Sequence, residues 1–141
     1  VATRSPSRQA LMGISFDTGA LVSLVERRRL SMRKVYDTAV TGAVPMRVST
    51  AVVAEWWRGG PGEKQRVEWL RSMHVEVVTE AIARLAGVAV GRVKGAGTID
   101  AIVLATAAVR GDRVVYTSDV GDLVRLRDNV AEFSFLGIEH A

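Results

Sequence analysis

The stretch TIDAIVLATAAVRGDRVVYTSD, residues 98–119, decides the fold. In its first half the apolar residues recur at helical spacing, which predicts a helix that Thr98 can cap and that Gly111 ends. In its second half residues 113–117 predict a strand, and Asp119 follows that strand directly. A helix that leads into a strand is the repeating unit of proteins with an α/β architecture.

The same alternation continues along the rest of the chain. Short β-type runs lie at 13–16, 46–49 and 75–78, and helical patterns lie at 20–26, 31–41, 52–58, 63–73 and after the N-cap candidate Thr79. A helical turn or two and an edge strand at 133–138 complete the pattern. Repeated β and α units without internal repeats predict an α/β fold with a central parallel β-sheet flanked by helices on both faces.

Length and composition predict one well-packed domain. The chain has 141 residues, of which 48% are hydrophobic, so a single buried core is expected. Ordered patterning begins at Met12, and we interpret residues 1–11 as a flexible N-terminal extension and residues 12–141 as the domain. No apolar run reaches the roughly eighteen residues of a membrane span. We therefore expect a soluble, cytoplasmic protein.

The composition also restricts the chemistry. Cysteine is absent and histidine occurs only at His74 and His140, which excludes thiol nucleophiles, disulfides and a Cys/His zinc cluster. A bound metal would have to take oxygen ligands, as magnesium, manganese and calcium do. The formal net charge of +4 favours a polyanionic partner such as nucleic acid.

Four acidic residues interrupt or end apolar segments. Asp17 and Asp119 each follow a strand, Glu55 lies in the helix after the second strand, and Asp100 lies in the first turn of an apolar helix. The carboxyl ends of parallel strands form the ligand crevice of an α/β sheet, and Asp17 and Asp119 fall there. Clustered carboxylates repel one another unless a cation neutralises them, so a divalent metal is expected.

These residues resemble those of the PIN-domain ribonucleases, and in particular the VapC-type toxins of bacterial toxin–antitoxin pairs. The resemblance extends from Met12 onward and depends on four motifs in this order: Phe-Asp-Thr at 16–18, Ala-Glu at 54–55, Thr-Ile-Asp-Ala-Ile-Val-Leu-Ala at 98–105, and Thr-Ser-Asp-Val-Gly-Asp-Leu at 117–123. Each motif is weak alone, and the set in this order and spacing is fairly specific.

The resemblance implies a PIN-like fold and a set of site residues. Asp17, Glu55, Asp100 and Asp119 would be the catalytic, metal-binding acids, and Asp122 would be a second-tier metal ligand. Thr18 and Thr117 would orient carboxylates or water. Gly19 departs from the family, which commonly has a serine at this position.

The resemblance also implies an activity and partners. The chain would be an endoribonuclease that uses Mg²⁺ or Mn²⁺ to activate water for hydrolysis of RNA, and it would act as the toxin of a toxin–antitoxin system. A small cognate antitoxin would insert an arginine or lysine toward the carboxylates and place an apolar helix near Leu24 and Trp56. A homodimer is also expected.

Other interpretations of the same residues remain open. Asp17 could be only a helix N-cap, Asp100 a first-turn acid favoured by the helix dipole, and Asp119 a turn residue. A structure-specific DNA nuclease and a catalytically silent binding module are alternative functions. A phosphoacceptor receiver domain requires two adjacent acids near the first strand, and here Asp17 is alone.

For four further features of the sequence, a structural interpretation is favoured over a functional one. The basic run at 27–29, with Arg33 and Lys34, is more often a solvated face than an RNA contact. Of the adjacent Trp56 and Trp57, one is expected in the core and the other in a subunit or partner contact. The two histidines receive no catalytic role. The glycines at 87–97 do not form a nucleotide-binding loop, since Ser or Thr does not follow Lys94.

Overall fold

The structure is a computed structural model, and it describes residues 12–141. The expected extension at residues 1–11 lies outside the described residues. In chain order the elements are β1 (Ile14–Phe16), α2 (Thr18–Leu21), the π-helix η1 (Val22–Glu26), α3 (Leu30–Thr41), β2 (Met46–Ser49), α4 (Thr50–Trp56), α5 (Glu63–Arg71), β3 (His74–Glu76), α6 (Glu80–Arg92), α7 (Thr98–Arg110), β4 (Val114–Thr117), α8 (Val120–Asn129), the 3₁₀ helix η2 (Ala131–Phe133) and β5 (Gly137–His140).

The five strands form one parallel sheet in the order β3-β2-β1-β4-β5. The chain adds β2 and β3 on one side of β1, and later adds β4 and β5 on the other side. The strand order therefore reverses between β1 and β4, which are paired neighbours in the sheet. In open α/β sheets this switch point is the place where ligands bind.

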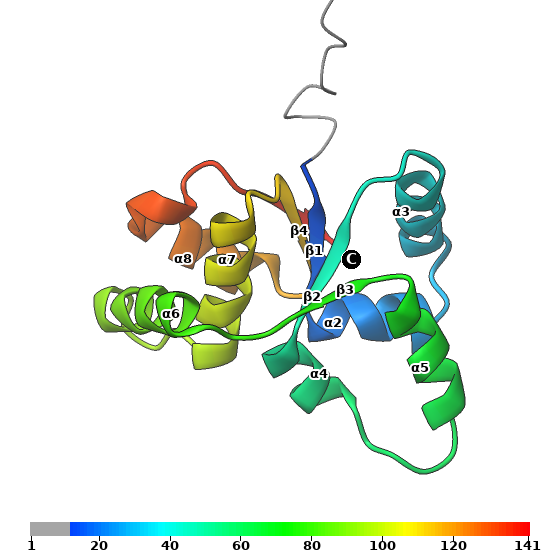
Figure 1. Cartoon of the computed structure of the whole chain (residues 1–141). Coiled ribbons are helices and arrows are strands. Elements are labelled where there is room, and N and C mark those ends of the chain that lie inside the picture. The colour runs from blue at the N-terminus through cyan, green and yellow to red at the C-terminus, as the bar shows by residue number, and fades with distance from the viewer. Residues whose placement is uncertain (1–11) are drawn as a thin grey trace, which may run out of the picture.

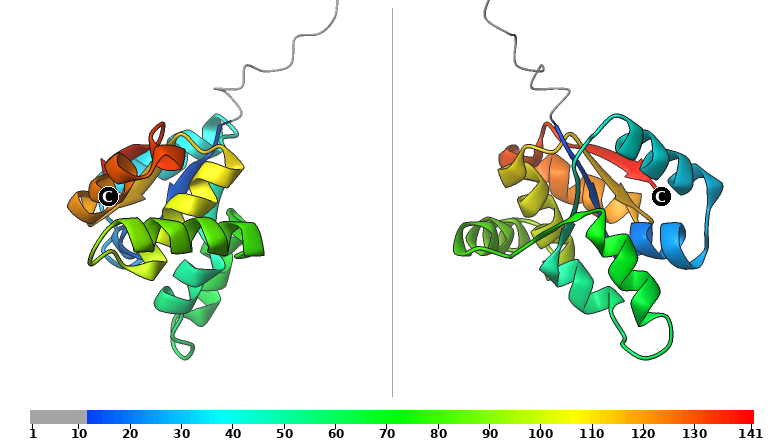
Figure 2. Two further views of the ribbon diagram at one scale, coloured as in Figure 1. Left: turned by 90° about the vertical axis from the view of Figure 1, so that its left-hand side faces the viewer. Right: turned by 45° about the vertical axis from the view of Figure 1, so that its right-hand side comes forward.

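Helices cover both faces of the sheet, as expected (Figure 1). Helix α7 contacts β1, β2 and β4, and it packs against α6 and α8 on one face. Helix α3 lies on the other face, with α5 beside the β3 edge, and the two views in Figure 2 separate these layers. Helices α2 and α4 lie at the end of the sheet where the strands terminate, so they border the switch point (Figure 1).

The core explains why α7 occupies the centre. Its residues Ala101, Val103, Leu104, Ala105 and Ala107 are all buried, because the helix has neighbours on more than one side. Gly111 ends the helix in the left-handed conformation at φ 74°, which glycine adopts without steric cost.

A network of polar and charged side chains links three strands of the sheet to the end of α7. Ser15 Oγ donates to Asp112 Oδ2 at 2.5 Å, and Arg47 pairs with the other oxygen of the same carboxylate. Arg47 also pairs with Glu76 at 3.3 Å, and Arg110 Nε pairs with Glu76 at 3.0 Å. Asp112 is fully buried, and burial raises its pKa although Ser15 and Arg47 counteract the rise. The network therefore connects β1, β2, β3 and the end of α7.

Most expected elements are present, and the differences have local causes. The strand expected at 133–138 begins only at Gly137, because residues 131–133 form a 3₁₀ helix that buries Phe133. Thr98 is the first residue of α7, and its N-cap is Gly97, which offers no side-chain cap. Thr79 caps α6 as expected, accepting from Ile82 N. Within residues 12–141 the helices are too short or too polar to cross a membrane.

Candidate active site

Asp17 lies at the carboxyl end of β1 and is held by two hydrogen bonds. Its Oδ1 accepts from the backbone N–H of Ala20 at 2.8 Å, so it does cap α2. Its Oδ2 accepts from the Thr117 hydroxyl at 2.5 Å. Burial raises the pKa of Asp17, and the carboxylates of Asp119 and Glu55 add to the rise, while the two hydrogen bonds lower it. Asp17 is therefore a cap and also a member of an acidic cluster.

Thr117 connects the ends of β1 and β4. Its hydroxyl donates to Asp17 and accepts from the backbone N–H of Asp119 at 2.9 Å. The Thr117 residue is fully buried, so its hydroxyl must find partners inside the protein. The chain of hydrogen bonds holds the backbone of Asp119 in register with the carboxylate of Asp17, across the switch point.

Glu55 reaches the same region from the last turn of α4. The Thr18 hydroxyl donates to Glu55 Oε1 at 2.6 Å. Glu55 is exposed, so this bond orients the carboxylate without removing it from solvent. Both threonines expected to orient carboxylates therefore do so, Thr117 for Asp17 and Thr18 for Glu55.

Asp100 shows that these carboxylates act on one another. Its pKa is raised from the ordinary value of 3.8 to about 6, first by burial and then by repulsion from Asp17, Asp119, Asp122 and Glu55, in that order. Asp100 in α7 therefore lies near enough to the other four expected acids, at the end of β1, in α4 and at the start of α8, for their charges to affect it.

Asp119 and Asp122 form the solvent-facing side of this cluster. Both are exposed, and Asp119 is the N-cap residue of α8, although its side chain makes no capping hydrogen bond. A hydrogen bond with the Asp122 carboxyl raises the pKa of Asp119. The two carboxyl groups therefore lie next to each other at the start of α8.

The donor set fits a hard divalent cation in kind. The cluster offers only carboxylate oxygens and threonine hydroxyls, the donors that Mg²⁺ and Mn²⁺ accept. Among residues 12–141, no three acidic or histidine side chains converge closely enough to hold a metal ion as they stand. Asp17 and Glu55 each accept a hydrogen bond from a threonine.

Gly19 has a steric explanation that sequence reasoning missed. A Cβ placed on Gly19 would lie 1.8 Å from Ser118 Oγ, so the hydroxyl of Ser118 fills the space of the missing side chain. The two residues are far apart in sequence, and only the pairing of β1 with β4 brings their loops together. In the sequence, the departure of Gly19 from the family's usual serine marked this position, but nothing there indicated the contact with Ser118.

The two tryptophans next to Glu55 differ in burial. Trp56 is 4% exposed, and its Nε1 donates to Glu26 at 3.1 Å. The guanidinium of Arg66 pairs with Glu26 at 3.2 Å and lies 5.5 Å from the centre of the Trp56 ring. Trp56 is therefore the core member of the pair, and it fastens α4 to η1 and α5. Trp57 is partly buried against the core.

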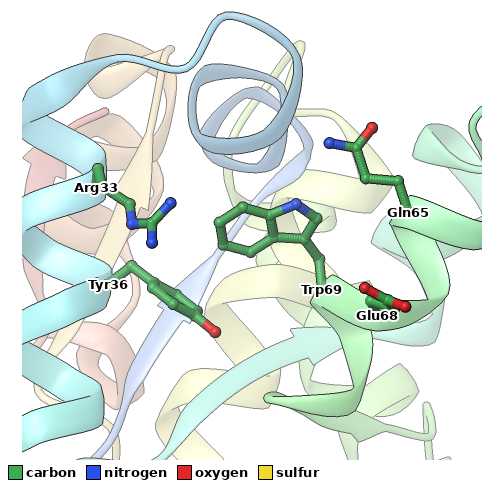
Figure 3. Close-up of a pocket in the computed structure, with 5 residues that line it drawn as sticks. All are labelled: Arg33, Tyr36, Gln65, Glu68 and Trp69. Atoms are coloured by element: carbon green, nitrogen blue, oxygen red, sulfur yellow. The ribbon is translucent and has the colours of Figure 1, made fainter.

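A groove between α3 and α5 lies outside the acidic cluster. Figure 3 shows Trp69 of α5 pointing toward Arg33 and Tyr36 of α3. The Trp69 ring lies 4.9 Å from the Tyr36 ring, and the Arg33 guanidinium lies 5.6 Å from the Trp69 ring. An adjoining hollow of about 310 Å³ is lined by Leu24, Val25, Arg28, Leu30, Arg33, Gln65 and Trp69. Part of the basic run therefore borders an apolar groove.

Comparisons with known proteins give one matching family model and solved structures with a similar fold. The sequence profile of the PIN domain matches residues 14–128. A solved structure of VapBC2 from Rickettsia felis, bound to a promoter DNA fragment, is similar with a TM-score of 0.73 at 12% identity, covering 92% of this chain and 99% of that chain. DNA-bound VapBC from Salmonella typhimurium gives 0.72 at 16% identity, with 92% and 98% coverage. No curated protein matches the chain in sequence.

Proposed function

The chain belongs to the PIN domain family, and we propose that its residues 12–141 are a metal-dependent endoribonuclease domain. The observation that carries the proposal is the acidic cluster at the switch point of the sheet, where burial and then repulsion from the neighbouring carboxylates raise the pKa of Asp100 to about 6. Such a concentration of like charge is costly for a protein that has no cation to neutralise it. Perturbed carboxylates in a crevice are typical of a functional site.

The proposed catalytic residues are Asp17, Glu55, Asp100 and Asp119, with Asp122 as an additional metal ligand. When bound, Mg²⁺ or Mn²⁺ would lower the pKa of a water molecule and stabilise negative charge on a phosphodiester. The exposed Asp119, Asp122 and Glu55 would meet the cation from the solvent side, and Asp17 would hold it from the sheet.

The two threonines prepare the carboxylates for this role. Thr117 and Thr18 each occupy one oxygen of an acid, which fixes the direction of the remaining lone pairs. Thr117 also fixes the backbone of Asp119. The chain has no cysteine, and its two histidines do not belong to the cluster, so no covalent enzyme intermediate is proposed.

We extend the proposal to the biological role. The similar structures from Rickettsia felis and Salmonella typhimurium are complexes that contain a VapB partner. We propose that this chain is likewise the toxin of a toxin–antitoxin pair, that it acts on RNA in the cytoplasm, and that it forms a homodimer. A small antitoxin would place a basic side chain among the carboxylates, where a cation gains charge-assisted hydrogen bonds.

The groove between α3 and α5 is the proposed seat of an antitoxin helix. Leu24 and Leu30 line the hollow that adjoins this groove, and Leu30 is 80% exposed. Trp56 does not line it, because that side chain is buried beside Glu26. Trp69 supplies the aromatic surface of the groove (Figure 3). We therefore propose that the antitoxin helix contacts Trp69, in place of the contact expected near Trp56.

A cleavage assay with matched variants tests the proposal. The purified chain should cut RNA with Mg²⁺ or Mn²⁺, lose activity in excess EDTA, and regain it when the metal is restored. Asp100→Asn should abolish cleavage, whereas Asp37→Asn, on the exposed outer side of α3, should not. Undiminished cleavage in EDTA would contradict the metal mechanism. Cleavage of DNA with no cleavage of RNA would assign the site to a DNA nuclease.

A further inference from the structure

Gly19 and Ser118 lie against each other where the β1–α2 and β4–α8 connections meet. A Cβ on Gly19 would lie 1.8 Å from Ser118 Oγ, 2.7 Å from Ser118 Cβ and 3.2 Å from Ser118 N. Rotation of the hydroxyl would relieve only the first of these contacts. A side chain at position 19 therefore requires the backbone of the β4–α8 connection to move.

The need for glycine at this position comes from the neighbouring connection. Gly19 is not among the residues with positive φ, so its backbone conformation is open to any residue. The three heavy atoms nearest to a Cβ at this position all belong to Ser118. The absence of a side chain at Gly19 therefore allows Ser118 to pack directly against the backbone of the β1–α2 connection.

This approach joins the two halves of the acidic cluster. Gly19 is two residues from Asp17, and Ser118 immediately precedes Asp119. Asp119 is exposed, and its backbone is held by the hydrogen bond from its N–H to Thr117 and by a longer one, at 3.4 Å, that its carbonyl accepts from the N–H of Leu123. The depth at which Ser118 packs on Gly19 therefore influences how far Asp119 lies from Asp17.

We propose that the contact between Gly19 and Ser118 is a positioning device that sets the separation of Asp17 and Asp119, so that both carboxylates can share one divalent cation. The inference rests on the metal site of the proposed function. Moving Ser118 Cβ from 2.7 Å to ordinary carbon contact displaces it by about 1 Å, since such contacts are roughly 3.5–4.0 Å. Mg²⁺ requires ligand oxygens at about 2.0–2.1 Å in near-ideal geometry, so a shift of this size weakens binding.

Calorimetric titration of the purified chain with Mn²⁺ tests this directly, without an activity readout. Gly19→Ala should lower the affinity for Mn²⁺ by about tenfold to a hundredfold, the usual effect of disturbing residues that support metal ligands. The double variant Gly19→Ala/Ser118→Gly removes the obstructing Oγ and Cβ and should recover most of the affinity. Gly87→Ala is the matched control, because a Cβ there meets nothing within 4 Å.

The outcomes separate this inference from the proposal it rests on. A wild-type chain that binds no Mn²⁺ overturns both. Wild-type binding with unchanged affinity in Gly19→Ala overturns the positioning inference alone. If Gly19→Ala fails to fold by circular dichroism, the double variant decides: recovery of fold and affinity supports the inference, and a folded double variant with weak binding overturns it.

Discussion

Thr117 lies 2.5 Å from Asp17 through a hydrogen bond that joins residues one hundred positions apart in the sequence. The same hydroxyl accepts the backbone N–H of Asp119. One buried threonine therefore determines how two strand ends present their carboxylates. In a site built from repelling charges, such a bond stabilises an arrangement that the carboxylates would not adopt by themselves.

Thr117→Val should reduce metal-dependent cleavage by about tenfold to a hundredfold. Valine keeps the shape of threonine but cannot donate to Asp17 or accept from Asp119, so both groups lose a partner. The pKa of Asp17 should rise further, because the hydrogen bond from Thr117 lowers it. Single-turnover kinetics at several Mn²⁺ concentrations would measure the effect. Thr117→Ser retains the hydroxyl and should stay close to wild type; equal activity of the valine variant would remove Thr117 from the site.

The metal-free protein should become less stable as the pH rises from about 4 to about 6. Asp100 has a folded pKa of about 6 against 3.8 when unfolded, so in this interval the folded state binds more protons than the unfolded state. Stability then falls with increasing pH, and the loss is complete above the folded pKa. The raised pKa values of Asp17 and Asp119 act in the same direction.

Asp100→Ala tests that relation. In EDTA at pH 7 it should melt at the same temperature as wild type or a few degrees higher, since it removes one member of the repulsive cluster. Its melting temperature should also depend less on pH between 4 and 6. Thermal denaturation followed by circular dichroism would measure both. A variant that unfolds instead would show that Asp100 serves the fold.

The network around the buried Asp112 should contribute to the free energy of unfolding and have little effect on metal binding. Asp112→Ala leaves Arg47 facing a cavity with Glu76 as its remaining partner. Loss of one partner from a buried pair costs about 3–5 kcal/mol, and the retained pair places this case near the lower end. Urea denaturation would measure the loss.

Asp37→Ala is the matched control for that experiment. It also removes an aspartate from an arginine pair, but Arg33 and Asp37 are 57% and 58% exposed. Exposed pairs contribute about 1 kcal/mol or less. Equal losses in the Asp37 and Asp112 variants would contradict the structural role of the buried network.

The bounds of helices and strands could be predicted from the sequence where a local pattern of residues determines them. The strand at Met46–Ser49 has the predicted bounds, and Gly111 ends α7 as predicted. The final strand was displaced, because an apolar run such as 133–136 can be a buried 3₁₀ turn as easily as a strand. Burial of Phe133 under the neighbouring helices decides that choice, and it depends on tertiary packing.

The same distinction applies to the site. The positions of the acids at strand and helix ends could be predicted from the sequence, because parallel strands end at a common edge. Their partners could not. The bond between Thr18 and Glu55 and the contact between Gly19 and Ser118 both depend on which loops the sheet order brings together.

The last prediction concerns the groove between α3 and α5. Leu30 is 80% exposed beside Leu24 and Trp69, and an exposed leucine that adjoins an aromatic hollow is a typical anchor for a partner helix. Arg28 and Arg33 border the same hollow, so the partner helix should carry acidic residues next to its apolar face.

Leu30→Asp should weaken binding of the proposed antitoxin by at least tenfold, since it places a negative charge opposite an acidic partner and removes an apolar contact. RNA cleavage by the free chain should not change, because Leu30 lies outside the acidic cluster. Co-expression followed by surface plasmon resonance would measure the affinity. Val88→Asp is the control, because it also places a negative charge at an exposed apolar residue but on α6, and this variant should bind normally. If Leu30→Asp and wild type bind the partner equally well, the partner helix occupies another surface. A complex that still cleaves RNA at the rate of the free chain would show that the partner does not inhibit this site.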